Sequence, residues 1–363
     1  MTLRVRRRHE GHPDWAPGGL LRSGRSIAVR STLVAIAMVS GCDEVAAPRD
    51  EDVGPAALVE LAAAPRFATY GDTLRVAVAR TAMPEAGWLR WRVDGVVTSG
   101  GMELKIVAPA RIDTVDVVVE IGVERTLAAD TVRIPVGNRF AILKVDDFGL
   151  GGELSPGWIW FLDYIADEQV CAALGLVARS LIAGNPVLVR AARDLTRSRH
   201  IEFWNHGYDH VLGAVDLAGH TYSEFRGPDV ATQLAHLQAA QQLALDSLGI
   251  VMHAFGAPGN QVDDNTVLAL ADVPEIDVWF FGRPMAGRLV LPRTVEAEES
   301  PGRVSFARFK TMYDAEATVT TLQLHPDGWS AASRAEFALI VDFLRARGIL
   351  FVTPGDYARH AGF

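Results

Sequence analysis

The sequence predicts a small all-β domain followed by a larger α/β domain, a (β/α) barrel. Three observations support this fold class. Residues 56–137 contain short alternating apolar and polar runs separated by turn residues, which is the pattern of strands. From residue 138 onward, short apolar runs alternate with helical ones, and about seven or eight such units are enough for a barrel of parallel strands. The hydrophobic content of 49% and the charged content of 22% are those of a globular protein.

The first 55 residues are expected to direct export and to tether the folded part. Arginine-rich runs precede the apolar run "STLVAIAMVSGC", which is too short to span a membrane and fits a signal peptide. Its last four residues, "VSGC", resemble a bacterial lipobox. We therefore expect residues 1–42 to be a lipoprotein signal peptide and Cys42 to carry the lipid. Residues 43–55 are then expected to form a tether, and the protein is expected to be lipid-anchored in the bacterial cell envelope. The sequence does not specify the membrane leaflet.

Residues 56–137 are expected to form a β-sandwich of immunoglobulin-like size. The runs "TLRVAVAR", "WLRWRVDG", "TVDVVVEIG" and "DTVRIPVG" have strand periodicity, and Trp91 is a candidate core residue. No catalytic pattern occurs in them. The other cysteine, Cys171, is expected to be a buried hydrophobe. The net charge of −9, with no basic stripe beyond the first thirty residues, excludes a nucleic-acid surface.

The elements expected in residues 138–363 follow one another in βα order. Strands are expected in "FAILKVDD", "AALGLVA", "IEFWNH", "MHAFGAPG", "IDVWFFG", "LVLP", "VSFARFK", "TVTTLQLH" and "ILFVT". Helices are expected in "GWIWFLDYIADE", "PVLVRAARDLTRS", "PDVATQLAHLQAAQQLALDSLG", residues 263–271 and "SRAEFALIVDFLRARG".

Carboxylates and imidazoles occur where several of these strands end. The first strand ends in Asp146 and Asp147, the third leads to His206 and His210, and a late one leads to His325. A further strand ends in "FGAPGN". The carboxyl ends of parallel strands lie at the same rim of a barrel, which is where sites are built. We therefore expect these side chains to meet.

The residue types indicate metal-assisted hydrolysis. Two imidazoles and one carboxylate are a typical three-ligand zinc site, which leaves one position open. Successive side chains of a strand point to opposite faces, so only one of Asp146 and Asp147 is expected to bind metal. The other can take a proton from water. His325, from a different strand, can protonate the leaving group.

The segments "VDDFG", "NHGYDH", "FGAPGN" and "LHPDGW", in this order, resemble the motifs of the polysaccharide deacetylase (NodB-homology, carbohydrate esterase family 4) family, in a divergent branch. The resemblance covers about residues 139–360. It implies a distorted (β/α) barrel and a divalent metal, usually zinc, that serves to hydrolyse N- or O-acetyl groups on sugars. It implies the following roles: Asp146 as base, Asp147, His206 and His210 as metal ligands, His325 as acid, and Pro258 and Gly259 as part of the substrate groove.

The sequence departs from the family pattern at two places. Phe148 stands where a glycine usually follows the paired aspartates, and Gly256 stands where an arginine often pairs with the base. No other residue of the sequence stands out as that partner. Asp277, close to Trp279, is matched to the residue that orients the acid histidine.

Two further assignments concern the surroundings of the site. Trp329 is a candidate for stacking on a sugar ring, as are Trp158 and Trp160, although aromatic residues near strand ends are more often core. Glu224 is read as a cap of the long helix that follows it.

The expected function is metal-dependent removal of acetyl groups from an envelope or extracellular polysaccharide, by a monomer. Two alternatives stay open: hydrolysis of a small amide that is not a glycan, and a non-catalytic glycan-binding lipoprotein. The sequence leaves the sugar, the acyl group and the metal open.

Overall fold

The computed structural model describes residues 57–110, 113–182 and 186–363. The expected signal peptide, the tether of residues 43–55 and Cys42 lie outside the described residues. Among the described residues, no helix combines the length and the apolar character needed to cross a membrane.

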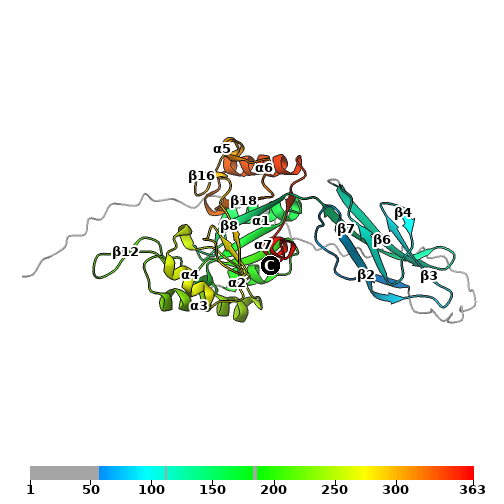
Figure 1. Ribbon diagram of the computed structural model, residues 1–363, viewed down its shortest axis with the longest axis horizontal. Helices are drawn as coiled ribbons and strands as arrows, with labels where there is room; N and C mark the ends of the chain where they lie inside the picture. The colour runs from blue at the N-terminus through cyan, green and yellow to red at the C-terminus, as the bar shows by residue number, and fades with distance from the viewer. Residues whose placement is uncertain (1–56, 111–112, 183–185) are drawn as a thin grey trace, which may run out of the picture. The chain divides into compact units, whose positions relative to one another are not determined.

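The strands between residues 58 and 136 form two antiparallel sheets with a shared core (Figure 1). One sheet contains β1 (Leu58–Leu61), β2 (Thr73–Ala82) and β5 (Glu103–Val107), and the other contains β4 (Val96–Thr98), β3 (Trp88–Val93), β6 (Asp113–Gly122) and β7 (Thr126–Val136). Trp91 is fully buried between them, and its indole donates a hydrogen bond to the carbonyl of Gly101 at 2.9 Å. Strands therefore form where they were expected and Trp91 lies in their core, while the immunoglobulin-like domain stays a prediction.

The rest of the chain is built on a parallel sheet of eight strands. The sheet order is β15 (Leu289–Leu291), β14 (Val278–Phe280), β13 (Ala254–Phe255), β10 (Ile201–Asn205), β9 (Ala172–Leu176), β8 (Phe140–Phe148) and β18 (Val319–Leu324), and β19 (Leu350–Phe351) also pairs with β8. A parallel bridge between Val295, just after β15, and Leu322 of β18 joins the two ends of the order. The seven-stranded path is therefore nearly closed, which confirms the predicted (β/α) barrel.

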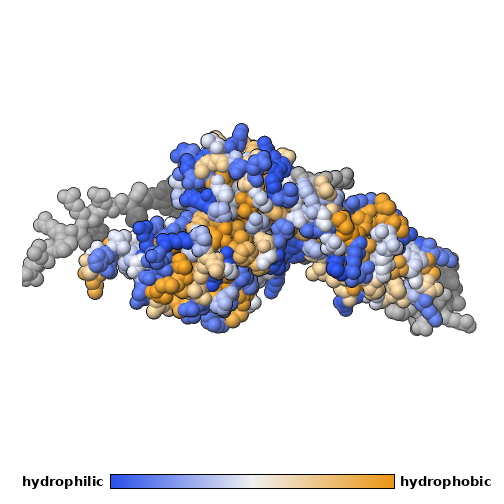
Figure 2. All heavy atoms as spheres, viewed as in Figure 1, coloured by the Kyte–Doolittle hydropathy of each residue, from blue (hydrophilic) through white to orange (hydrophobic). Residues whose placement is uncertain are grey.

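Helices separate most of the strands. They are α1 (Pro156–Asp167), α2 (Pro186–Leu195), α3 (Val230–Leu248), α4 (Asp264–Ala271), α5 (Phe306–Met312), α6 (Ala331–Arg345) and α7 (Pro354–His360). Two short antiparallel ladders are β11 (Ala214–Val215) with β12 (Thr221–Tyr222) and β16 (Glu298–Ser300) with β17 (Arg303–Val304), and single 3₁₀ turns lie at Ala178–Leu181, Pro258–Asn260 and Pro326–Gly328. In the view of Figure 2, hydrophilic side chains cover most of the surface over α5 and α6.

One predicted strand is wrong. "VSFARFK" forms the end of β17 and then helix α5, because the Ser305 side chain accepts a hydrogen bond from the amide of Arg308 and so caps a helix. The buried Phe309 then anchors that helix. The long helix α3 follows the prediction closely, with Asp229 as its N-cap and Gly249 ending it at φ 72°.

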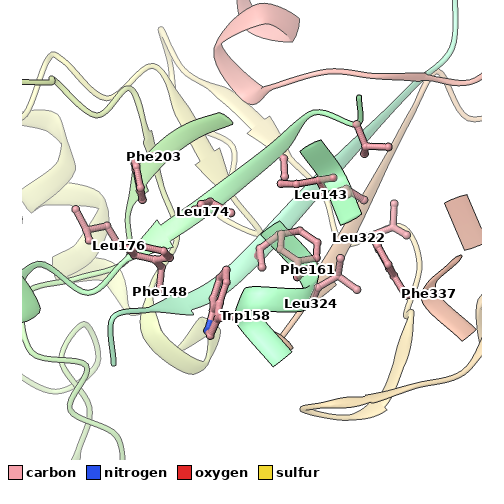
Figure 3. Packing of buried hydrophobic residues seen from close by; sticks show 14 of the residues in the cluster. Leu143, Phe148, Trp158, Phe161, Leu174, Leu176, Phe203, Leu322, Leu324 and Phe337 are labelled. Carbon is pink, nitrogen blue, oxygen red and sulfur yellow. The ribbon is translucent and has the colours of Figure 1, made fainter. Parts of the chain in front are cut away.

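The main core lies between the sheet and the helices α1 and α6 (Figure 3). Phe148 of β8 and Trp158 of α1 are in edge-to-face contact, with ring centroids 5.3 Å apart, and Phe161 packs against Phe337 of α6. Trp158 is therefore a core residue and does not contact a sugar. Cys171 is buried as predicted, and burial raises the pKa of its thiol to about 12.

The start of α1 is packed against the loop that follows β18. A Cβ atom at Gly157 would lie 1.8 Å from the carbonyl oxygen of Pro326, the residue after His325. We expect Gly157→Ala to lower the free energy of unfolding by about 1–3 kcal/mol, because the helix or the loop must move. Chemical denaturation measures this. Gly151→Ala, where an added Cβ meets nothing within 4 Å, is the matched control, and equal stability of the two variants would contradict the packing argument.

Candidate active site

The structure brings Asp147, His206 and His210 together at the carboxyl ends of β8 and β10. Asp147 Oδ1 lies 3.1 Å from His206 Nε2 and 2.8 Å from His210 Nε2. The three potential ligand atoms all lie within 4.8 Å of one another. The convergence expected from the strand ends is therefore present.

Both aspartates face this cluster, contrary to the alternation expected of a regular strand. The pairing of β8 with β9 shifts register between Val145 and Phe148, and Asp147 has φ 70°. Such an irregularity re-aims a side chain within a strand. As a result, His206 Nε2 is 3.1 Å from Asp147 Oδ1 and 3.8 Å from Asp146 Oδ2. One strand end thus supplies two carboxylates to one site.

The donor set fits a divalent cation such as zinc. His206 Nδ1 lies 2.7 Å from the carbonyl oxygen of Gly256, so this nitrogen carries the proton and the Nε2 lone pair points toward Asp147. A lone pair facing a carboxylate oxygen is favourable when a proton or a cation lies between them. Burial alone would raise the pKa of Asp147, but the adjacent imidazoles of His206 and His210 lower it well below its usual range.

Asp146 is buried and is held by side chains of β8 and β18. Lys144 Nζ lies 2.5 Å from its Oδ1 and 2.7 Å from its Oδ2, and Gln323 Nε2 donates to Oδ2 at 2.7 Å. Burial by itself would raise the pKa of Asp146, but the charge of Lys144 and the neighbouring imidazoles outweigh it and lower the pKa. Sequence reasoning missed Lys144, although residues two apart on a strand share a face.

His325 is oriented by Glu298. Glu298 Oε2 lies 2.6 Å from His325 Nδ1, and Oε1 accepts from the His325 amide at 2.9 Å. Nε2 of His325 then lies 3.7 Å from Asp146 Oδ2. Burial lowers the pKa of His325, but the hydrogen bond with Glu298 and the charge of Asp146 outweigh this effect, so the pKa is raised.

The assignment of Asp277 as the residue that orients His325 is wrong. Asp277 directly precedes β14, at the amino end of a parallel strand and hence at the edge of the sheet opposite the site. Its side chain is 47% exposed, and Oδ2 lies 3.5 Å from His253 Nδ1. Glu298 of β16 has the expected contact instead, and no motif in the sequence marked it.

Trp329 does not offer a face for a sugar. It is buried against Phe161 and Phe337, and its indole donates to Glu298 Oε1 at 3.0 Å. The expectation of stacking is therefore wrong, because the ring packs in the core and supports the partner of His325.

A polar cavity lies beside the cluster. It has a volume of about 330 Å³, and its lining includes Gly259, Asn260, Arg293, Glu296, Gln323 and His325. Gly259 lines the cavity, whereas the adjacent Pro258 is buried. The cavity can receive a polar group next to the candidate acid.

Glu224 holds the loop that carries the two histidines. Its carboxylate is buried and accepts hydrogen bonds from the amides of Tyr208 at 2.5 Å and His210 at 2.7 Å. His236 of α3 lies 3.0 Å from Oε1, and this contact raises the pKa of His236. Glu224 is thus a clamp on the loop. It does not cap the long helix, as the sequence suggested, because the N-cap of α3 is Asp229. Glu224, His236 and Asp209 also offer potential ligand atoms within 4.8 Å of one another.

Solved carbohydrate esterases are among the structures that are similar to this chain. No protein-family model and no curated protein sequence matches the chain. A family 4 acetyl xylan esterase from Clostridium thermocellum, solved with a cobalt ion, is 15% identical with a TM-score of 0.44, over 62% of this chain and 92% of that one. A family 4 carbohydrate esterase from Streptomyces lividans, solved with acetate, is 15% identical with a TM-score of 0.40, over 59% and 91%.

A family 4 pseudoenzyme from Bacillus anthracis is also similar, at 14% identity with a TM-score of 0.44, over 61% of this chain and 67% of that chain. These are likenesses of fold. What the chain does has to be argued from its own side chains.

We expect Glu224→Gln to weaken metal binding about 10- to 100-fold, because an amide group cannot accept from both backbone amides and the imidazole at once. Competition between the protein and a zinc chelator measures the affinity. The exposed Glu316 provides the matched control, Glu316→Gln. Unchanged zinc affinity in Glu224→Gln would show that the loop keeps its shape without the clamp.

Proposed function

We propose that this protein is a metal-dependent hydrolase that removes acetyl groups from a polysaccharide. The observation that carries the proposal is the cluster of Asp147, His206 and His210, with the buried carboxylate of Asp146 and the imidazole of His325 within 4 Å of each other beside it. Hydrolysis of an ester or amide needs an electrophilic centre, a base and an acid, and these residues can supply all three.

Asp147, His206 and His210 would hold the metal, and zinc suits two imidazoles and one carboxylate. A bound metal of this kind polarises the acyl carbonyl and makes water more acidic. Asp146, kept ionised by its lowered pKa, takes a proton from the attacking water. His325, whose raised pKa favours the protonated form, donates a proton to the departing nitrogen or oxygen. The C–N or C–O bond breaks, and acetate and a free amine or hydroxyl group are released.

The polar cavity beside His325 supports a substrate with hydroxyl and acylamino groups, as in a sugar. The proposal further includes the lipid anchor at Cys42, a location in the bacterial cell envelope, a monomeric state and a glycan of the envelope or its surroundings as substrate. Acetylated xylan and oligomers of N-acetylglucosamine are suitable first substrates, because they separate O- from N-deacetylation.

Acetate release by Asp146→Asn tests the proposed base. We expect the rate to fall about 100- to 10,000-fold with about one equivalent of zinc still bound, since the amide cannot take the proton. Mass spectrometry of the metal content and an acetate assay check both parts. The double variant His206→Ala/His210→Ala, in contrast, should lose both the metal and the acetate release. Absence of metal in the wild type after addition of zinc, or glycan binding without any acetate release, would contradict the hydrolase proposal.

The pH profile of kcat/KM tests the role of Glu298. Asp146 must be ionised, and its lowered pKa places the acidic limb at low pH; His325 must be protonated, and its raised pKa places the alkaline limb at high pH. In Glu298→Gln, the pKa of His325 loses the contribution that raises it, so the alkaline limb should move to lower pH while the acidic limb stays in place. An unmoved alkaline limb would exclude His325 as the group that titrates there.

A further inference from the structure

We propose that Lys144 is the positioning residue of the reaction: it holds the carboxylate of Asp146 in the orientation needed for proton transfer, in a space that Gly256 leaves open. The inference rests on the proposed function. It concerns a residue of β8 and one of the segment that follows β13, which are separated in the sheet by β9 and β10 but lie in contact.

The contact between Lys144 and Asp146 is buried and involves both carboxylate oxygens. Lys144 is fully buried, Asp146 is 1% exposed, and the two N–O distances are 2.5 and 2.7 Å. Gln323 adds a third hydrogen bond to the same carboxylate. A carboxylate held at both oxygens cannot rotate freely, so its direction relative to His206 and His325 is fixed.

Aromatic rings enclose the ammonium group on its other sides. Nζ lies 4.7 Å from the ring centroid of Trp204, 5.1 Å from that of Phe281 and 5.8 Å from that of Phe280. Such rings attract a cation electrostatically and also exclude water. The ammonium is therefore directed toward Asp146 rather than toward solvent.

Gly256 makes room for this arrangement. A Cβ atom there would lie 2.8 Å from the Trp204 ring, 3.2 Å from Lys144 Cε and 3.3 Å from Phe280 Cβ. Any side chain at this position would press on the lysine stem and on the ring that covers it. The same residue accepts the proton of His206 Nδ1 through its carbonyl oxygen. The absence of a side chain at Gly256 thus leaves room for Lys144, which holds Asp146, and its backbone carbonyl orients His206.

The choice of lysine at this position is itself informative. The sequence contains 35 lysines and arginines, and only Lys105, Lys144 and Lys310 are lysines. A compact ammonium can make two short contacts in an apolar enclosure, whereas a guanidinium is larger and planar. A buried ion pair is also no strong source of stability, because desolvation offsets the attraction. Both observations point to a role in the reaction rather than in folding alone.

The test compares Lys144→Met, Lys144→Arg and the exposed control Lys105→Met in the full chain loaded with zinc. We expect Lys144→Met to lower kcat for acetate release about 10- to 100-fold, with KM within about twofold and the zinc content unchanged. Lys144→Arg, which keeps the charge, should recover part of the lost kcat. Lys105→Met should behave as the wild type.

Four outcomes decide the matter. Wild-type kcat in Lys144→Met would overturn this inference alone, and so would a loss of zinc from Lys144→Met. A wild type that binds zinc but releases no acetate would overturn the proposed function and this inference with it. If Lys144→Met fails to fold, the double variant Lys144→Met/Asp146→Asn decides. Its folding would support the pairing, whereas its failure to fold would make Lys144 a packing residue and overturn the inference.

Discussion

The site depends on one local irregularity of backbone in β8. Adjacent residues of a regular strand point to opposite faces, yet Asp146 and Asp147 both face the cluster because the register shifts between Val145 and Phe148. The left-handed conformation of Asp147 carries a conformational cost, which the surrounding hydrogen bonds must offset. With both carboxylates on one side, a single strand end can supply a metal ligand and a base, and the remaining strands need to supply only imidazoles and their supports.

The supporting contacts follow one chemical rule. Each group that is expected to act is fixed by a buried partner of complementary character: His206 by the carbonyl of Gly256, the His210 loop by Glu224, and His325 by Glu298. Asp146 has its partner in Lys144. Each of the three oxygen acceptors, Gly256, Glu224 and Glu298, lies in a segment other than the one that it supports. The site is thus assembled by contacts between segments that are distant in the sequence, which explains why the nearly closed sheet is needed to position it.

The sequence predicted those parts of the molecule that local pattern determines. The βα order, the strand ends and the meeting of the paired aspartates with the two histidines followed from periodicity and from the geometry of parallel strands. The choice of Asp147 as the metal ligand followed from the resemblance to the deacetylase family. The residues that hold the site in place could not be predicted in this way. Glu298 lies in the short strand β16 and Glu224 between β12 and α3, and no spacing marks either as a partner. Asp277 was chosen by its match to a family motif, although the expected strand "IDVWFFG" already placed it near the amino end of that strand. The strand expected in "VSFARFK" was wrong because a single capping serine outweighed its apolar content.

The double use of Gly256 couples two positions of the chain. A Cβ atom there would lie 2.8 Å from the Trp204 ring and 3.2 Å from Lys144 Cε, so a larger residue needs both neighbours to shift. A shorter residue at 144 gives part of that room, but it leaves the buried carboxylate of Asp146 without its cation. Substitutions at the two positions are therefore expected to be non-additive, and each position constrains which residues the other can accept.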